Sequence, residues 1–178
     1  MLLDVLPLTG AFKIRLDTQA DERGFFARRF CAATFADHGL ETDFVQRSVS
    51  YNARRGTLRG LHFQAPPHAE TKIVRCTRGS IFDVIVDLRA KSPTFGRWHA
   101  ETLTADNHIA LYVPKGFAHG FQTLEDVTEI DYEITPAYVP GFARGVRFDD
   151  KELGIEWPIS SAILSDRDRN LPGLRGLR

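Results

Sequence analysis

The sequence predicts an all-β fold, a sandwich or a barrel, from one clear strand and a series of closely spaced turns. Residues 81–88 read IFDVIVDL, and their side chains alternate between two faces as they do in a strand. Turn signals recur at 78–79, 92–93, 105–107, 114–116, 125–126 and 135–136. The segments between them are about ten residues long, a length that suits antiparallel strands. The middle of the chain is therefore expected to form a sandwich or a barrel.

Helix is scarce in the pattern. The best candidate covers residues 32–38, with Gly39 as its C-cap, and a second short turn is expected near 149–153. The tail, 170–178, is rich in glycine, proline and arginine and is expected to fray. We find no repeat, low-complexity tract or linker, so a single domain is expected to span residues 1–178.

Composition narrows the range of partners. The 178 residues include 23 basic and 23 acidic side chains, so no overall field favours nucleic acid or an anionic membrane. No apolar stretch approaches the length of a membrane span, and the first residues lack the basic region of a signal peptide. Cys31 and Cys76 lack the spacing of a metal site and are expected to be reduced. We therefore expect a cytoplasmic protein that binds a small molecule.

Five short segments concentrate polar residues among the expected strands. They are DERGFF at 21–26, RGTLRGLHFQ at 55–64, TKIVRC at 71–76, PKGFAHGF at 114–121 and LSDRDRN at 164–170. Each is a weak signal alone. In this order, with FDVIVDLR, SPTFGRW and LGIEWP between them, they resemble the dTDP-4-dehydrorhamnose 3,5-epimerase family over nearly the whole chain.

The resemblance implies a fold, an assembly and a substrate. The fold is a double-stranded β-helix, a cupin-like jelly-roll barrel, with a few short helices. The assembly is a homodimer, and the substrate is a 4-keto-6-deoxy hexose linked to dTDP. Metal-binding cupins use a His-x-His pair, whereas LHFQ at 61–64 offers one histidine and the others are isolated. We therefore expect neither a metal nor a redox cofactor.

Epimerisation beside a ketone needs a base, a group that steadies the enolate oxygen, and an acid on the opposite face. The resemblance implies that His62 is the base, since histidine has an ordinary pKa near neutrality. It also implies that Asp168 orients this histidine, with Asp166 as a nearby rival. Tyr132 alternates with acidic residues in EIDYEIT, is expected to point inward, and matches the proton donor. Lys72 matches the lysine beside the keto oxygen, although without the resemblance each residue has an ordinary structural reading.

The expected substrate contacts rest mainly on the motifs. Charge-assisted donors suit a diphosphate, and basic residues stand at three matching positions. One glutamine and one histidine match further substrate contacts. The set is Arg23, Gln46, Arg59, His119 and Arg167.

Two of these assignments conflict in a regular strand. Strict alternation would put Arg59 and His62 on opposite faces, whereas both are wanted in one pocket. Glycine inside a strand often marks a bulge, and one extra residue at Gly60 would bring both side chains to the same face.

The chain also departs from the family pattern. Many members carry Gln-Asp-Asn where this chain has Gln46, Arg47 and Ser48, and glutamates common in the family are replaced by Arg28 and Ala143. These changes bear on the nucleotide or the sugar more than on proton transfer. A single-centre epimerase, a cupin-type 3,4-ketoisomerase and a non-catalytic nucleotide-sugar-binding barrel therefore remain alternatives.

Overall fold

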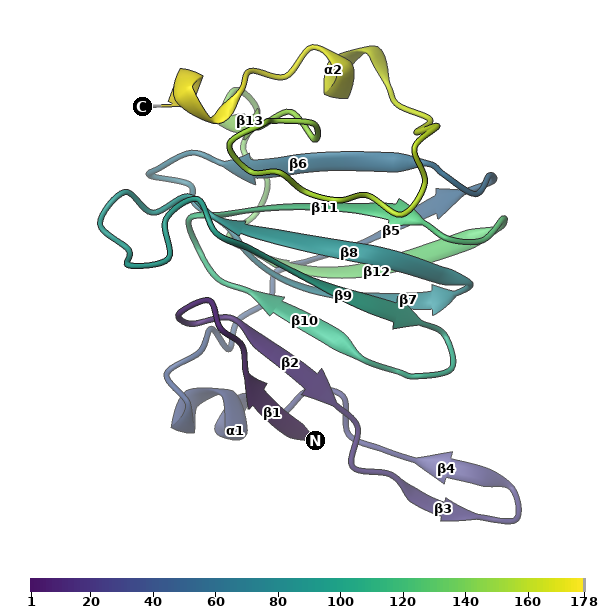
Figure 1. Cartoon of the computed structure of the whole chain (residues 1–178). Coiled ribbons are helices and arrows are strands. Elements are labelled where there is room, and N and C mark those ends of the chain that lie inside the picture. Colours follow the sequence, from purple (N-terminus) through teal and green to yellow (C-terminus); the bar gives the residue numbers. More distant parts are fainter. Residues whose placement is uncertain (178) are drawn as a thin grey trace.

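Two antiparallel sheets form the body of the protein (Figure 1). The structure is a computed structural model and describes residues 1–177. The six-stranded sheet has the order β1 (Leu2–Val5), β2 (Phe12–Arg15), β10 (Ala110–Val113), β7 (Thr71–Arg78), β12 (Thr128–Thr135) and β5 (Gln46–Asn52). The five-stranded sheet has the order β13 (Ala143–Gly145), β6 (Leu58–Gln64), β11 (Phe117–Thr123), β8 (Ser80–Asp87) and β9 (Trp98–Thr104). The predicted all-β jelly-roll class is confirmed.

The remaining elements are short. Strands β3 (Gln19–Asp21) and β4 (Gly24–Phe26) form a separate hairpin that stands away from both sheets (Figure 1). The helices are α1 (Ala32–Asp37), α2 (Asp166–Arg169) and the 3-10 helix η1 (Leu174–Leu177). Helix α1 and the positive φ of Gly39, 68°, agree with the predicted helix and cap. Within residues 1–177 no helix is long and apolar enough to cross a membrane.

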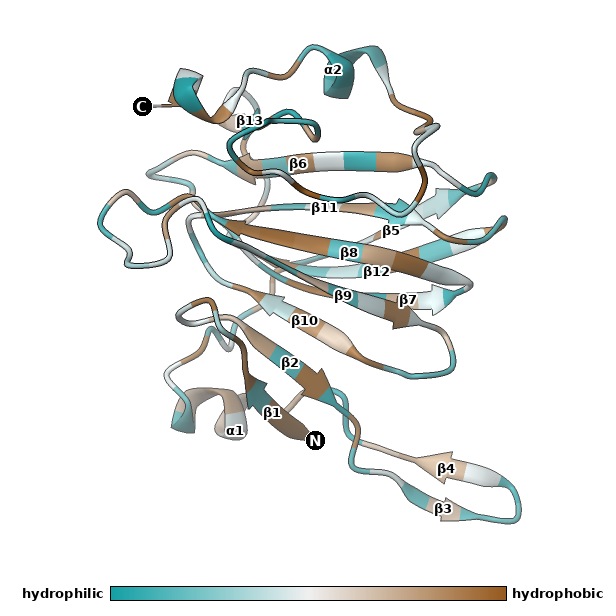
Figure 2. Cartoon of the chain, viewed as in Figure 1, coloured by the Kyte–Doolittle hydropathy of each residue, from teal (hydrophilic) through white to brown (hydrophobic). Residues whose placement is uncertain are grey.

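Strand β8 is buried on both sides, which explains its nearly continuous apolar sequence. Ile81 and Ile85 lie in the core between the sheets. Val84 and Val86 belong to a second cluster on the outer side of the five-stranded sheet. Figure 2 shows how apolar this strand is along most of its length. The two aspartates of β8 are fully buried and so need polar partners.

The C-terminal segment completes the second cluster. Leu174 in η1 is buried there, and its N–H donates to Asp150 Oδ2 at 2.9 Å. Asp150 lies in the turn expected near 149–153, where its Oδ1 accepts the N–H of Glu152 at 2.8 Å. The expectation that the tail frays is therefore wrong for residues 170–177, because a leucine anchors them; Arg178 lies outside the described residues.

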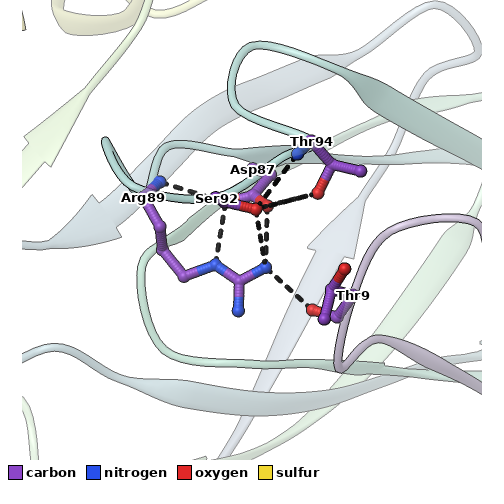
Figure 3. Close-up of polar contacts among 5 residues, drawn as sticks. All are labelled: Thr9, Asp87, Arg89, Ser92 and Thr94. Atoms are coloured by element: carbon purple, nitrogen blue, oxygen red, sulfur yellow. Dashed lines mark hydrogen bonds and ion pairs between the residues drawn. The ribbon is translucent and has the colours of Figure 1, made fainter.

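The buried carboxylate of Asp87 fixes the loop after β8 (Figure 3). It accepts hydrogen bonds from Arg89 Nη2 at 2.7 Å and Thr94 Oγ1 at 2.6 Å, and from Ser92. Arg89 Nη2 also donates to the carbonyl of Thr9 at 2.8 Å, which ties this loop to the N-terminal turn. Burial works to raise the pKa of Asp87, but these donors outweigh it and lower the pKa to about 2.

Strand β6 carries the bulge that the sequence predicts. Its residues 62 and 59 pair with residues 119 and 121 of β11, so three steps along β6 match two along β11. Gly60 has a φ of 134°, and a Cβ there would lie 2.6 Å from the Cα of Gly120. The extra residue brings Arg59 and His62 to the same face, and both line one cavity.

Candidate active site

A cavity of about 410 Å³ opens between the two sheets. Strands β5, β6, β7, β11 and β12 contribute to its wall, together with the segment around α2 that lies over β6 (Figure 1). Seven of the nine site residues predicted from the sequence line this cavity, and two do not. The seven are Arg59, His62, Lys72, His119, Tyr132, Arg167 and Asp168.

His62 and Asp168 form a hydrogen-bonded pair. His62 Nε2 lies 2.6 Å from Asp168 Oδ1, and the N–H of Gly60 donates to Asp168 Oδ2 at 3.3 Å. Burial works to raise the pKa of Asp168, but the bonds from His62 and Gly60 and the His62 charge outweigh it, and the net pKa is lowered. An ionised carboxylate only accepts hydrogen bonds, so Nε2 carries a hydrogen. In the neutral ring this leaves Nδ1 as the basic nitrogen, as a proton acceptor requires.

Helix α2 explains why Asp168 rather than Asp166 meets the histidine. Ser165 is the N-cap, and its Oγ accepts the N–H of Asp168 at 3.1 Å. This cap turns Asp168 toward β6, where it is 4% exposed, whereas Asp166 faces solvent. The predicted choice between the two aspartates agrees with this geometry.

Tyr132 reaches the cavity from the opposite sheet. It lies on β12 between Ile130 and Ile134, and it lines the cavity. Burial and, next, the negative charge of Asp83 raise the pKa of this phenol far above its ordinary value, and Arg59 offsets only part of this. The hydroxyl therefore holds its proton firmly at neutral pH.

Lys72 supplies a positive charge inside the cavity. It is 8% exposed, and its Nζ lies 2.9 Å from Glu70 Oε1. A longer contact, 3.5 Å, joins Nζ to the backbone oxygen of His62. A fixed ammonium at this point can offset negative charge that develops on a nearby oxygen.

A second histidine–aspartate pair lies beside the first. His119 Nε2 is 2.7 Å from Asp83 Oδ1 and Oδ2, and the His119 ring meets Tyr132 edge-on at 5.9 Å. Burial raises the pKa of the fully buried Asp83 carboxyl, against the opposing effects of His119 and Lys72. Sequence reasoning missed Asp83, although an acidic residue between Ile81 and Ile85 on the core-facing side of β8 was a signal for it.

Arg23 does not reach this cavity. It lies on the β3–β4 hairpin, its side chain is 84% exposed, and it pairs with Asp21 at 2.5 Å. The expectation that it joins the other residues is not met within one chain, because the hairpin stands away from the sheets (Figure 1). Arg59 is instead held at the cavity, where its Nε donates to Asn52 Oδ1 at 2.8 Å.

Gln46 acts on the cavity wall indirectly. Its Oε1 accepts the N–H of Tyr138, and Gln64 Oε1 accepts the N–H of Val139 at 2.8 Å. The two glutamines thereby hold a segment whose half-exposed tyrosine ring lines the cavity. Gln46 itself is absent from the lining, so its predicted role as a direct contact is not met in this arrangement.

Three of the departures from the family pattern separate into two groups. Ser48 and Ala143 line the cavity with short side chains. Arg47 pairs with Glu133 at 3.8 Å, next to Arg75, on the face of the sheet opposite Tyr132. Ser48 and Ala143 therefore bear on what the cavity accepts, and Arg47 does not.

Nothing in residues 1–177 gathers three or more histidine, cysteine, aspartate or glutamate side chains in a way that could hold a metal ion. The chemistry offered by the cavity is that of its own acids, bases and cations. It has the His62 imidazole on one wall, and the Tyr132 phenol and the Lys72 ammonium on the other.

Comparisons with known proteins agree with this arrangement. The family profile described as dTDP-4-dehydrorhamnose 3,5-epimerase matches residues 5–176. An enzyme of that name from Methanothermobacter thermautotrophicus is 43% identical over 171 residues, covering 94% of this chain and 91% of the relative. The enzyme from Bacillus anthracis, solved with TDP and PPi bound, is 46% identical with a TM-score of 0.93, over 97% of this chain and 98% of that one.

A solved relative with a narrower activity is also similar. A 3'-monoepimerase from Streptomyces bikiniensis, in complex with dTDP-quinovose, is 34% identical with a TM-score of 0.88, over 96% of this chain and 86% of that one. The profile match covers nearly the full chain, and the fold and cavity agree with it. The chain therefore belongs to the dTDP-4-dehydrorhamnose 3,5-epimerase family of isomerases.

Proposed function

We propose that this chain, acting as one domain over residues 1–178, converts dTDP-4-dehydro-6-deoxyglucose to dTDP-4-dehydrorhamnose by inverting C3 and C5. The observation that carries the proposal is that the His62–Asp168 pair and the Tyr132 hydroxyl face one cavity from opposite sheets. Inversion requires removal of a proton from one face of the sugar and its return from the other. The reaction uses no metal and no redox cofactor.

His62 removes the protons. The C4 ketone acidifies C3 and C5, and the Nδ1 atom takes up each proton in turn. Asp168 stabilises the resulting imidazolium through its 2.6 Å bond to Nε2. The ammonium of Lys72 offsets the charge that grows on the C4 oxygen. Removal of the C3 and C5 protons can share this one base, because the two carbons flank the same C4 ketone.

Tyr132 returns the proton. Its raised pKa keeps the phenol protonated until the enolate, a strong carbon base, accepts the proton. Its position on β12, across the cavity from His62 on β6, supports delivery to the opposite face of the ring.

The nucleotide lies toward the mouth of the cavity. Arg59 and Arg167 line the wall and suit the negative charge of a diphosphate. The half-exposed ring of Tyr138 offers a stacking surface to a base.

The functional unit is a homodimer. An isolated two-stranded hairpin is marginally stable in water, and β3–β4 carries Phe25, 47% exposed, and Phe26, 78% exposed. A second copy would cover these rings, and Arg23 on the same hairpin would then add a cation to the partner's cavity. Light scattering tests this part of the proposal, since a monomer at working concentration contradicts it. Two free cysteines, Cys31 and Cys76, suit the reducing cytoplasm, where we place the enzyme.

Proton NMR in deuterated water, with dTDP-4-dehydro-6-deoxyglucose, tests the reaction. Exchange at both C3 and C5 is the expected result. Exchange at one centre alone would make this protein a single-centre epimerase, like the 3'-monoepimerase among its solved relatives. A product whose ketone has moved from C4 to C3 would identify a 3,4-ketoisomerase. No exchange at either centre would show that dTDP-4-dehydro-6-deoxyglucose is not the substrate. Another nucleotide sugar should then be tried, because Ser48 and Ala143 line the cavity with short side chains.

A further inference from the structure

Glu70 lies in the cavity beside Lys72 and has no role in the reaction described so far. It immediately precedes β7, and since side chains two apart share a face of an extended chain, both residues point inward. Their side chains are 9% and 10% exposed, and the ion pair joins Glu70 Oε1 to Lys72 Nζ at 2.9 Å. A pair this well covered is screened little by solvent.

Asp168 in the cavity wall and the buried Asp83 behind it are both committed elsewhere. Asp168 is bonded to His62 and Asp83 to His119, each at 2.7 Å or less. Within residues 1–177, Glu70 is the carboxylate with which Lys72 forms an ion pair. Glu70 is therefore the counter-charge that determines where the flexible lysine side chain ends.

The donors of Lys72 show what this fixing achieves. An ammonium has three N–H donors. Glu70 Oε1 holds the nitrogen as an ion pair at 2.9 Å, and one N–H donates to the His62 carbonyl oxygen at 3.5 Å. The remaining N–H donors are left for an oxygen in the cavity. The ion pair and the hydrogen bond together fix the position of the nitrogen.

We propose that Glu70 is a positioning residue of the epimerisation, which holds the Lys72 ammonium so that its free N–H meets the C4 oxygen as the enolate forms. The inference rests on the proposed function, because that function places the C4 oxygen of the substrate beside Lys72. Glu70 exchanges no proton and makes no bond to the sugar. Its effect is preorganisation, which matters most when charge is greatest, in the transition state.

The test compares two substitutions of Glu70 with a matched control. Glu70→Ala removes the counter-charge of Lys72, and we expect kcat for exchange at C3 and C5 to fall by about 10-fold to 100-fold. KM and the dissociation constant for dTDP should stay within about 2-fold, since the lost interaction belongs to the transition state. Glu70→Asp keeps the negative charge beside Lys72, so it should retain more of kcat than Glu70→Ala. Glu101→Ala breaks another lysine–glutamate pair, Lys13–Glu101 at 3.1 Å, outside the cavity, and should leave kcat unchanged.

A double-mutant cycle shows whether Glu70 acts through Lys72. In a Lys72→Met background, Glu70→Ala should cause no further loss of exchange. If exchange in that background is too slow to measure, a crystal structure of Glu70→Ala with dTDP decides. The proposal expects Lys72 Nζ to leave the His62 carbonyl, and an unmoved Nζ overturns it.

Other outcomes separate this inference from the function on which it rests. If wild-type protein shows no exchange, the proposed function has failed. If the wild type exchanges and Glu70→Ala matches it, only the role of Glu70 is wrong. A rise in KM with unchanged kcat would mean that Glu70 contacts the substrate directly, and equal losses with and without Lys72 would also overturn the positioning role.

Discussion

His62 and His119 are direct cross-strand partners in β6 and β11, and the Nε2 atom of each is bonded to a different aspartate. The two pairs differ in access. The side chain of His62 is 33% exposed and that of His119 is 4% exposed. A base must exchange its proton with water between turnovers, so this difference favours His62 as the base and leaves His119 with a contact or structural role.

Replacing His62 with Asn should abolish exchange at both C3 and C5. The substitution removes the basic nitrogen but keeps an amide that can donate to Asp168, so the melting temperature should stay close to that of the wild type. NMR in deuterated water and thermal unfolding measure the two effects. His38→Asn is the control, since His38 is exposed at the end of α1 and does not line the cavity. Exchange at the wild-type rate would remove His62 from the mechanism.

Tyr132→Phe should impair inversion more than proton removal. The phenyl ring keeps the packing against His119 but has no proton to return, while His62 and Lys72 still form the enolate. Deuterium should enter at C3 and C5 with retained configuration, and product analysis should show inversion slowed by about 100-fold or more relative to exchange. Equal loss of both processes would argue against Tyr132 as the donor.

Asp87 should make stability depend on acidity. Its pKa falls from an ordinary 3.8 to about 2 on folding, so its contribution is complete above about pH 4. That contribution is lost as pH falls through the folded value, and amounts to about 2 kcal/mol. Urea unfolding between about pH 5 and pH 2 should show wild type and Asp87→Asn converging as acid is added. Exposed Asp106 serves as the control, and a gap between wild type and Asp87→Asn that stays constant with pH would refute this account.

Gly60→Ala should destabilise the fold strongly. The added Cβ would lie 2.6 Å from the Cα of Gly120, and the φ of 134° is unfavourable for alanine. Gly141→Ala separates the two causes, because Gly141 has a φ of 88° with nothing within 4 Å of its Cβ. We expect about 1–2 kcal/mol for Gly141 and clearly more for Gly60, by urea unfolding. Equal losses of unfolding free energy in the two variants would show that β6 and β11 can move apart at Gly60 with little cost.

Local patterns predicted the parts of the fold that depend on nearby residues. The strand at 81–88 and the helix at 32–38 follow from alternation and from a C-terminal glycine. The bulge at Gly60 was predictable for a different reason, since two side chains wanted in one cavity could not share a face without it.

Long-range partners account for what the sequence did not predict. His119 follows Asp83 by 36 positions and lies on another strand, and no spacing rule links the two residues. Leu174 is held by a turn 24 positions earlier, so composition alone suggested fraying. Arg23 belongs to a hairpin that stands away from both sheets (Figure 1), and its side chain does not line the cavity of its own chain. In each case the deciding contact depends on tertiary packing.

The close backbone contact between Gly60 and Gly120 limits how the enzyme could be redesigned for other sugars. The two backbones approach too closely for even a methyl group, so neither glycine can be replaced without moving a strand. The relative positions of Arg59 and His62 should therefore stay the same in any variant that folds. Ser48 and Ala143, by contrast, border empty space at the cavity wall. Selection for a new nucleotide sugar should therefore find its useful variants at these two positions while the catalytic frame stays constant.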